Sequence, residues 1–266
     1  MRLQSTLKKQ QGFTIIELVV VILLLGILAA TALPRFIDVT TQAHDSAFQG
    51  TAGGLITGVS LYRAEWTARG QPAANVPLQS YGGLRAAPGY SNGAYVADTG
   101  AGDSSFTAPA TFTGRSLGYP LATTASINKG TFAASHCVEV FENALQAGAP
   151  SIRVHTTSTL GNLPDEAAAD IRTAASNAAA NSAADFYAFT ATVEINTGFA
   201  RAGAEIGAAG TPSNYEDTVP GCVYIYTGEA ENFDRAILYV PWTGRVESYE
   251  TIEALIAASE YDGPTV

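Results

Sequence analysis

The amino-terminal part of the chain contains an apolar run, residues 13–33, in which Glu17 is the one charged residue. As a helix these 21 residues would measure roughly 31 Å, which is long enough to cross the hydrocarbon core of a bilayer. Three basic residues precede the run, and the next one along the chain is Arg35. That asymmetry predicts a cytoplasmic amino terminus and an exported body after residue 33.

Three kinds of segment share this hydropathy: a secretory signal peptide, an uncut single-span anchor, and a leader that is cut just ahead of the helix. The small residues Ala30-Thr31-Ala32 fit a signal peptide, but the run is longer than the roughly 7–15 residues of a signal-peptide core. Glu17 favours the third kind, because a carboxylate within a membrane helix is costly and requires a partner or a function. Only that interpretation also gives the pair Gly12-Phe13 a role.

The segment KKQQGFTIIEL, residues 8–18, resembles the class III leader of type IV pilins and pseudopilins. The resemblance implies that a prepilin peptidase cuts after Gly12 and N-methylates the new first residue, Phe13. It also implies that Glu17 is the assembly residue, which meets the free amine of Phe13 in a neighbouring subunit. Because each unpaired charge in hydrocarbon costs several kcal/mol, the pairing offsets that cost and fixes the axial register.

Helical periodicity continues beyond the apolar run. Pro34 lacks a backbone N–H donor and is expected to kink the helix near the membrane exit; the alternative is that Pro34 ends the membrane helix. Apolar residues then recur at spacings of 7, 4, 3 and 4, which places them on one helical face. The helix is predicted to end near Arg69, ahead of Gly70 and Pro72. The apolar face consists of Phe48, Leu55, Val59, Tyr62 and Trp66.

Residues 71–266 are expected to form a globular head. Residues 71–135 are rich in Gly, Pro, Ser and Thr, which indicates surface loops with short strands. A short helix is predicted from Cys137 to Gly148. Residues 165–184 favour either an exposed helix or a flexible insertion, because they offer almost no apolar face. Alternating apolar runs predict strands at residues 186–195, 222–226, 236–240 and 246–249.

The predicted fold class is α+β, with a long amino-terminal helix packed on an antiparallel sheet. The late strands and the segment TALPRF, residues 31–36, resemble type IV pilins of the mannose-sensitive haemagglutinin kind. Residues 71–135 and 155–215 carry no such resemblance and are interpreted as lineage-specific additions. The predicted domains are a leader (1–12), a transmembrane and polymerisation helix (13–34), an amphipathic second half of the helix (35–70) and the head (71–266).

The chain has two cysteines, Cys137 and Cys222, which lie 85 residues apart. In an exported chain an even, low count predicts one disulfide. Closing a loop of this length would stabilise the fold by on the order of 4–5 kcal/mol in the chain-entropy model. The alternative is a pair of buried free thiols, which would suit a cytosolic chain.

No catalytic or metal-binding pattern accompanies these features. The histidines His44, His136 and His155 do not have zinc-ligand spacing, and the oxygen-rich stretch 98–103 lacks the spacing of a calcium loop. Cleavage of residues 1–12 leaves 11 of the 14 basic residues against 24 acidic ones, a net charge of −13. Such a body disfavours general nucleic-acid binding. We expect no enzyme activity, no cofactor and no metal.

The sequence therefore favours a structural subunit of a type IV pilus used for adhesion or motility. Such a subunit would span the inner membrane once before assembly and lie in an extracellular filament afterwards. The expected partners are other pilin subunits, the prepilin peptidase and an inner-membrane assembly platform, with a surface or glycan ligand left open. The alternatives are a minor pilin or type II secretion pseudopilin, and an adhesive or DNA-binding module that recognises its target through residues 155–184.

Overall fold

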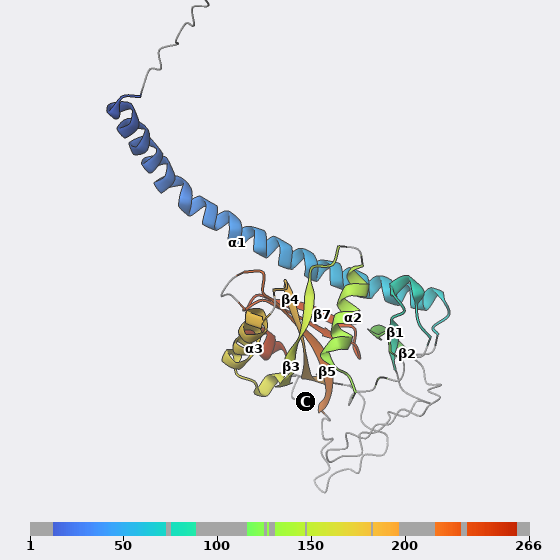
Figure 1. Cartoon of the computed structure of the whole chain (residues 1–266). Helices are drawn as coiled ribbons and strands as arrows, with labels where there is room; N and C mark the ends of the chain where they lie inside the picture. Colours follow the sequence, from blue (N-terminus) through green and yellow to red (C-terminus); the bar gives the residue numbers. More distant parts are fainter. Residues whose placement is uncertain are drawn as a thin grey trace, which may run out of the picture. The chain divides into compact units, whose positions relative to one another are not determined.

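The computed structural model describes residues 13–72, 76–88, 116–124, 127, 131–146, 148–181, 183–196, 216–229 and 233–259 (Figure 1). The chain divides into two compact units, residues 1–46 and 47–266, which are considered separately below. The predicted α+β class is confirmed: one long helix precedes a set of strands and shorter helices. Gly12 and the rest of the predicted leader lie outside the described residues, as does the oxygen-rich stretch 98–103.

Helix α1 comprises residues Ile15–Ala68, without a break at Pro34. The interpretation in which Pro34 ends the helix is therefore wrong, and the kink at Pro34 stays a prediction. The helix ends one residue before the predicted Arg69. Gly70 follows with a φ of 81°, a left-handed conformation that glycine adopts without strain.

A five-stranded sheet forms the centre of the second unit, in the order β3-β4-β5-β6-β7. Strands β4, β5, β6 and β7 pair antiparallel, as predicted, but β3 pairs parallel to β4. Two shorter strands, β1 and β2, form a separate antiparallel pair. The bounds are Arg85–Pro88 (β1), Ser116–Ala122 (β2), Ile152–Asn162 (β3), Phe186–Asn196 (β4), Glu216–Tyr226 (β5), Ala236–Val240 (β6) and Arg245–Tyr249 (β7).

One face of the sheet packs against α1, α2 (Ala134–Leu145) and the β1–β2 pair. The predicted apolar face of α1 supplies its side of this core: Phe48, Leu55 and Tyr62 are completely buried. Alternate residues of the strands supply the other side, because successive side chains of a strand point to opposite faces. These strand residues are Phe186, Ala188, Cys222, Tyr224, Tyr226, Ile237 and Tyr239.

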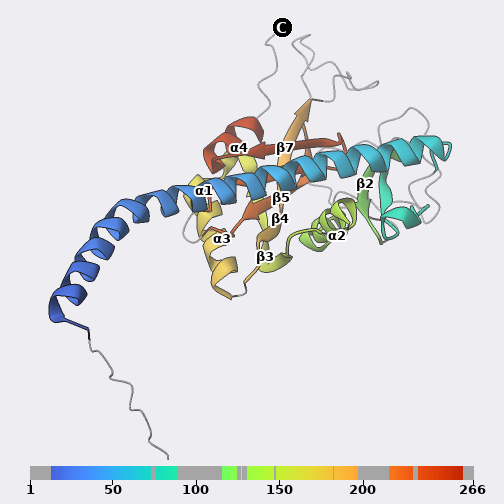
Figure 2. The ribbon, with the colours of Figure 1, turned by 90° about the horizontal axis from the view of Figure 1, so that it is seen from above.

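The opposite face of the sheet has a core of its own, covered by α3 (Ala168–Asn181) and α4 (Ile252–Ser259), which contact each other (Figure 2). The sequence pattern predicted no element at α4 and almost no apolar face on α3. The structure shows that Ile171, Ala175 and Ala178 on α3 are fully buried. A connection between parallel strands must cross over a face of the sheet, and α3 lies in the connection between β3 and β4. It is therefore neither an exposed helix nor a flexible insertion.

Candidate functional site

The first unit exposes an apolar helical surface. Residues Ile15–Ala32 of α1 have a mean hydropathy of 2.8 and none of them is buried, so by length and composition this segment can cross a membrane. Phe13, the predicted first residue of the mature chain, is 89% exposed. A soluble protein rarely leaves so many contiguous large apolar side chains in contact with water, which indicates that lipid or another protein covers this surface.

The amino end of α1 is closed by a capping box that the sequence analysis missed. The Thr14 backbone N–H and the Thr14 hydroxyl both donate to Oε2 of Glu17, at 2.9 and 2.7 Å. In return, the backbone N–H of Glu17 donates to the Thr14 hydroxyl oxygen at 3.3 Å. The pattern Thr-x-x-Glu ahead of an apolar run is the known signature of this motif and could have predicted it. The predicted assembly residue is thus bonded to the residue that follows Phe13.

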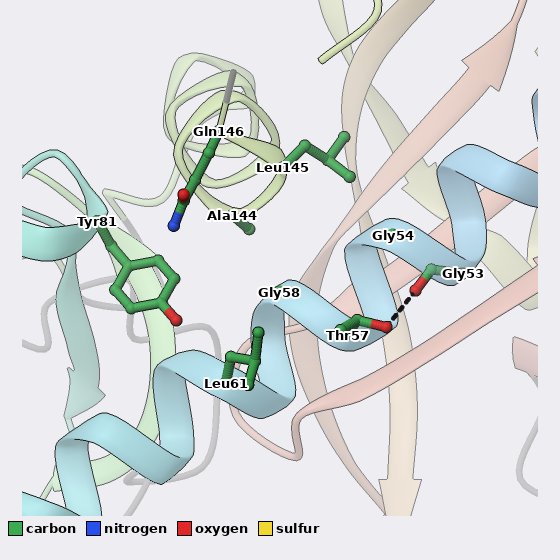
Figure 3. A pocket seen from close by; sticks show the side chains of 9 residues that line it. All are labelled: Gly53, Gly54, Thr57, Gly58, Leu61, Tyr81, Ala144, Leu145 and Gln146. Atoms are coloured by element: carbon green, nitrogen blue, oxygen red, sulfur yellow. Dashed lines mark hydrogen bonds between the residues drawn. The ribbon is translucent and has the colours of Figure 1, made fainter. Parts of the chain in front are cut away.

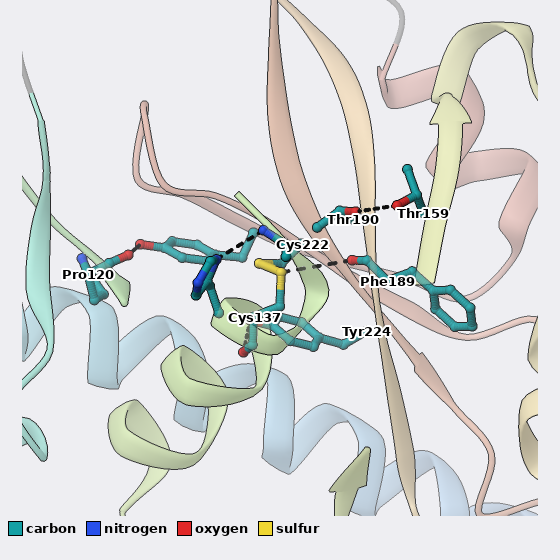
Figure 4. Close-up of a disulfide and its surroundings, with 10 residues drawn as sticks. Pro120, Cys137, Thr159, Phe189, Thr190, Cys222 and Tyr224 are labelled. Carbon is teal, nitrogen blue, oxygen red and sulfur yellow. Dashed lines mark hydrogen bonds between the residues drawn. A yellow bond between two sulfur atoms is a disulfide. The ribbon is translucent and has the colours of Figure 1, made fainter. Parts of the chain in front are cut away.

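The second unit contains a disulfide between Cys137 and Cys222, with a Cα–Cα distance of 5.5 Å (Figure 4). It joins α2 to β5 on the face of the sheet that packs against α1. The Tyr224 hydroxyl donates to the carbonyl of Cys137 at 2.9 Å, which adds a second link between the same two elements. Both cysteines are completely buried, and neither has a free thiol.

An open groove of about 370 Å³ lies between α1 and the carboxyl end of α2 (Figure 3). Gly54 and Gly58 of α1 line it where α2 comes close: an added Cβ would lie 2.8 Å from Cδ2 of Leu145 at Gly54, and 2.3 Å from the carbonyl oxygen of Ala144 at Gly58. These two glycines therefore allow the close approach of α1 and α2. The groove brings together no set of titratable side chains with which to carry out catalysis. Its lining consists of Gly53, Gly54, Thr57, Gly58, Leu61, Tyr81, Ala144, Leu145 and Gln146.

Among the side chains that the structure describes, no group of three His, Cys, Asp or Glu residues converges; the side chain of His155 lies outside them. His136 has a structural function instead: its Nδ1 accepts the backbone N–H of Ala133 at 3.0 Å, at the start of α2. Burial lowers the pKa of His136, and the nearby Glu139 acts in the opposite direction. Both effects concern the stability of α2 and point to no catalytic function.

One arginine of α3, Arg172, forms ion pairs with two carboxylates outside its own helix. Arg172 on α3 contacts Asp234 at 2.5 Å and Glu253 on α4 at 2.7 Å. The hydrogen bonds that Arg172 donates to these two carboxylates raise its pKa, with the bond to Glu253 as the larger cause. The pair with Glu253 joins α3 to α4, and the pair with Asp234 joins α3 to the segment before β6. Both are structural contacts.

The α+β architecture and the long apolar amino-terminal helix are consistent with the pilin fold. A family model described as "Prokaryotic N-terminal methylation motif" matches residues 7–33, the segment that contains Gly12, Phe13 and Glu17. The amino terminus of this chain therefore has a type IV pilin motif, as the sequence analysis predicted. No solved structure shows a significant match to the chain.

Curated relatives are similar to the chain over a limited stretch. The chain is 47% identical over 47 residues to a type IV narrow pilus major component from Thermus thermophilus, covering 18% of this chain and 40% of that protein. It is 48% identical over 54 residues to a fimbrial protein from Moraxella nonliquefaciens (20% and 35%). A type IV major pilin protein from Neisseria gonorrhoeae is 47% identical over 53 residues (20% and 32%). The chain thus spans about a third to two fifths of the length of these relatives. The likeness to mannose-sensitive haemagglutinin pilins stays a prediction.

Proposed function

We propose that this chain is a structural subunit of a type IV pilus, polymerised through helix α1. The observation that carries the proposal is the coincidence of the methylation motif at residues 7–33 with an apolar helix, Ile15–Ala32, that has no buried residue. A surface of this kind needs lipid around it before assembly and other subunits around it afterwards. The relatives that share the motif are described as pilus and fimbrial components, which supports the same conclusion.

In this proposal, a prepilin peptidase removes residues 1–12 and methylates the amine of Phe13. The chain then spans the inner membrane once through residues 13–34, with residues 35–70 and the head 71–266 outside the cytoplasm. Glu17 pairs with the Phe13 amine of a neighbouring subunit as the filament grows, because two charges in an apolar environment stabilise each other only when they are close. An exported head also fits the disulfide, since such bonds persist in oxidising compartments.

The test combines mass spectrometry and mutation in the natural host. Filaments sheared from cells should contain this subunit beginning with N-methyl-phenylalanine at position 13, and recovery of residues 1–12 in the mature protein would refute the proposed processing. Glu17→Ala should leave the subunit inserted and cleaved but prevent normal polymerisation. Wild-type yields of filament from that variant would refute the pairing function of Glu17. The abundance of the subunit in filaments distinguishes a major subunit from a minor pilin.

A further inference from the structure

The groove between α1 and the carboxyl end of α2 contains a buried polar group without a protein partner. Tyr81, the last residue of the short helix η1 (Gln79–Tyr81), lines the groove and is only 6% exposed. Among the described residues its hydroxyl makes no hydrogen bond. Figure 3 shows this hydroxyl directed toward the side of the groove that α1 forms. Buried polar groups are normally hydrogen-bonded, so the hydroxyl is available to a group that enters the groove.

The Tyr81 ring is held in place by its surroundings. It contacts the ring of Tyr62 edge-on, with the ring centroids 5.3 Å apart, and its backbone N–H donates to the carbonyl of Leu78 at 3.1 Å. The Tyr62 ring is fixed in turn, because its hydroxyl donates to the carbonyl of Leu84 at 3.2 Å. Burial, and then the nearby Glu65 carboxylate, raise the pKa of Tyr81, so the hydroxyl keeps its proton. The groove thus presents an ordered group that both donates and accepts.

A second polar side chain reaches the groove from the end of α2. Gln146 has a φ of 57° and a ψ of −144°, a conformation that residues other than glycine rarely adopt. Figure 3 shows its side-chain amide extending toward Tyr81, and within the described part of the chain that amide makes no hydrogen bond. Glycine would relieve the strain but would remove the amide. The strained backbone therefore keeps a second donor and acceptor at the groove.

The rest of the lining determines which chemistry fits. None of the described residues that line the groove is charged, although acidic residues outnumber basic ones 24 to 14 along the chain. Leu61, which is 56% exposed, and Leu145 add apolar surface beside the two polar groups. A neutral sugar ring matches this lining, because its hydroxyls both donate and accept while its C–H groups pack against apolar side chains.

A peptide fits the groove less well. An extended peptide binds by adding a strand to the edge of a sheet, but the described lining comes from α1, η1 and α2 and includes no strand. A helical peptide has its backbone groups bonded internally, so its backbone offers no partner to the Tyr81 hydroxyl.

We propose that this groove is a binding subsite for the ring of a neutral sugar, which the Tyr81 hydroxyl and the Gln146 amide hydrogen-bond. Leu61 and Leu145 pack against the C–H groups of the ring. The groove is open and its volume of about 370 Å³ is near the lower end for small-molecule sites, so it accommodates one unit of a longer glycan. The use of this subsite in adhesion rests on the proposed function, whereas binding by the subunit itself does not.

Ligand-observed NMR on the mature subunit tests the site directly. The subunit is kept in phosphocholine micelles, because a detergent with a sugar headgroup would compete. The probes are the methyl glycosides of glucose, galactose and N-acetylglucosamine, with a methyl glucuronide as the anionic control and an end-blocked trialanine as the peptide control. We expect at least one neutral sugar to bind with a Kd on the order of 1–10 mM, and both controls to bind more weakly. Failure of all three neutral sugars, or a control that binds as tightly as the best of them, would overturn the proposal.

Two hydroxyl deletions form a matched pair. Tyr81→Phe removes the hydroxyl in the groove and keeps the ring contact with Tyr62. Tyr187→Phe removes a hydroxyl that is likewise buried without a partner among the described residues, but Tyr187 belongs to the core on the opposite face of the sheet. Tyr81→Phe should raise the Kd about three- to tenfold, as expected for the loss of one neutral hydrogen bond, and Tyr187→Phe should leave it unchanged. An unchanged Kd for Tyr81→Phe, or equal increases for both variants, would refute the site.

Gln146→Gly separates binding from stability. Glycine adopts a positive φ without strain, so the urea midpoint of this variant should rise, while loss of the amide should raise the Kd about threefold or more. A variant that binds the sugar as tightly as wild type would contradict the proposed site.

The binding assay requires no filament, so it separates this inference from the proposed function. Sugar binding by a subunit that is absent from sheared filaments would leave the site intact and refute the pilus function. A subunit that forms filaments but binds none of the neutral sugars would leave the pilus function intact and refute the site.

Discussion

Two glycines on α1 offer a matched test of how this helix packs on the head. Gly53 and Gly58 both lie within the helix and both line the groove beside α2. They differ in their surroundings: a Cβ at Gly53 would meet nothing within 4 Å, whereas one at Gly58 would lie 2.3 Å from the carbonyl oxygen of Ala144 and 2.8 Å from its carbonyl carbon. The same change, Gly→Ala, should therefore have opposite effects at the two positions.

The magnitudes follow from two competing contributions. Alanine is favoured over glycine in a helix interior by up to about 1 kcal/mol, so Gly53→Ala should stabilise the protein by about 0.5–1 kcal/mol. Gly58→Ala gains the same preference, but the new methyl group overlaps backbone atoms that cannot rotate away. Overpacking of this kind costs about 1–3 kcal/mol, so the net effect should be a destabilisation of about 1–2 kcal/mol.

Urea unfolding of the mature subunit in detergent micelles measures this difference. The fluorescence of Trp66 can report the transition, since the residue is only 7% exposed and its indole N–H donates to the carbonyl of Pro72 at 2.9 Å. The free energies of unfolding of the two variants should differ by about 2 kcal/mol with Gly53→Ala the more stable. Equal stability of the two variants, or the reverse order, would refute the packing argument.

The disulfide and the histidine cap lead to two further predictions. The disulfide closes an 85-residue separation, and its reduction should lower the free energy of unfolding by at most about 4–5 kcal/mol. A reductant should therefore lower the urea midpoint of wild type but not that of the control variant Cys137→Ser/Cys222→Ser. An unchanged wild-type midpoint would contradict the prediction. His136 has its pKa lowered from 6.5 in the folded state, chiefly by burial, so the unfolded chain binds the proton more readily. Stability should therefore fall as the pH drops below about 6.5, and His136→Gln should show a smaller pH dependence than wild type between pH 7.5 and 5.5. The same pH dependence in both proteins would show that other groups cause it.

Local signals in the sequence were sufficient for the elements with strong periodicity. The apolar face of α1 and the strands β4, β6 and β7 lie close to the predicted ranges, because 3.6-residue and two-residue periods are properties of the chain itself. Strand β5 ends at the predicted Tyr226 but begins at Glu216, six residues before the predicted start. The cap of α1 is equally local, because Thr14 and Glu17 are three residues apart and the Thr-x-x-Glu pattern can be recognised from the sequence.

Contacts between distant residues explain what the sequence did not predict. Strand β3 pairs parallel to β4 through a connection that contains α3, and no local pattern specifies a parallel partner. The burial of Ala175 and Ala178 on α3 follows from that crossover, since alanines carry little hydrophobic signal of their own. In the same way, Gly58 looks like a weak point of the helix in the sequence, and only the approach of Ala144 gives it a packing function.

The apolar amino-terminal helix, the position of Glu17 within it and the methylation motif that encloses both follow from the order of residues along the chain. These features depend on neighbours within a few residues, so they can be read along the chain. The core on each face of the sheet and the meeting of two cysteines 85 residues apart, between α2 and β5, depend on the folded arrangement. Such contacts form only when the chain folds back on itself, because burial and pairing depend on distance in space rather than on distance along the sequence.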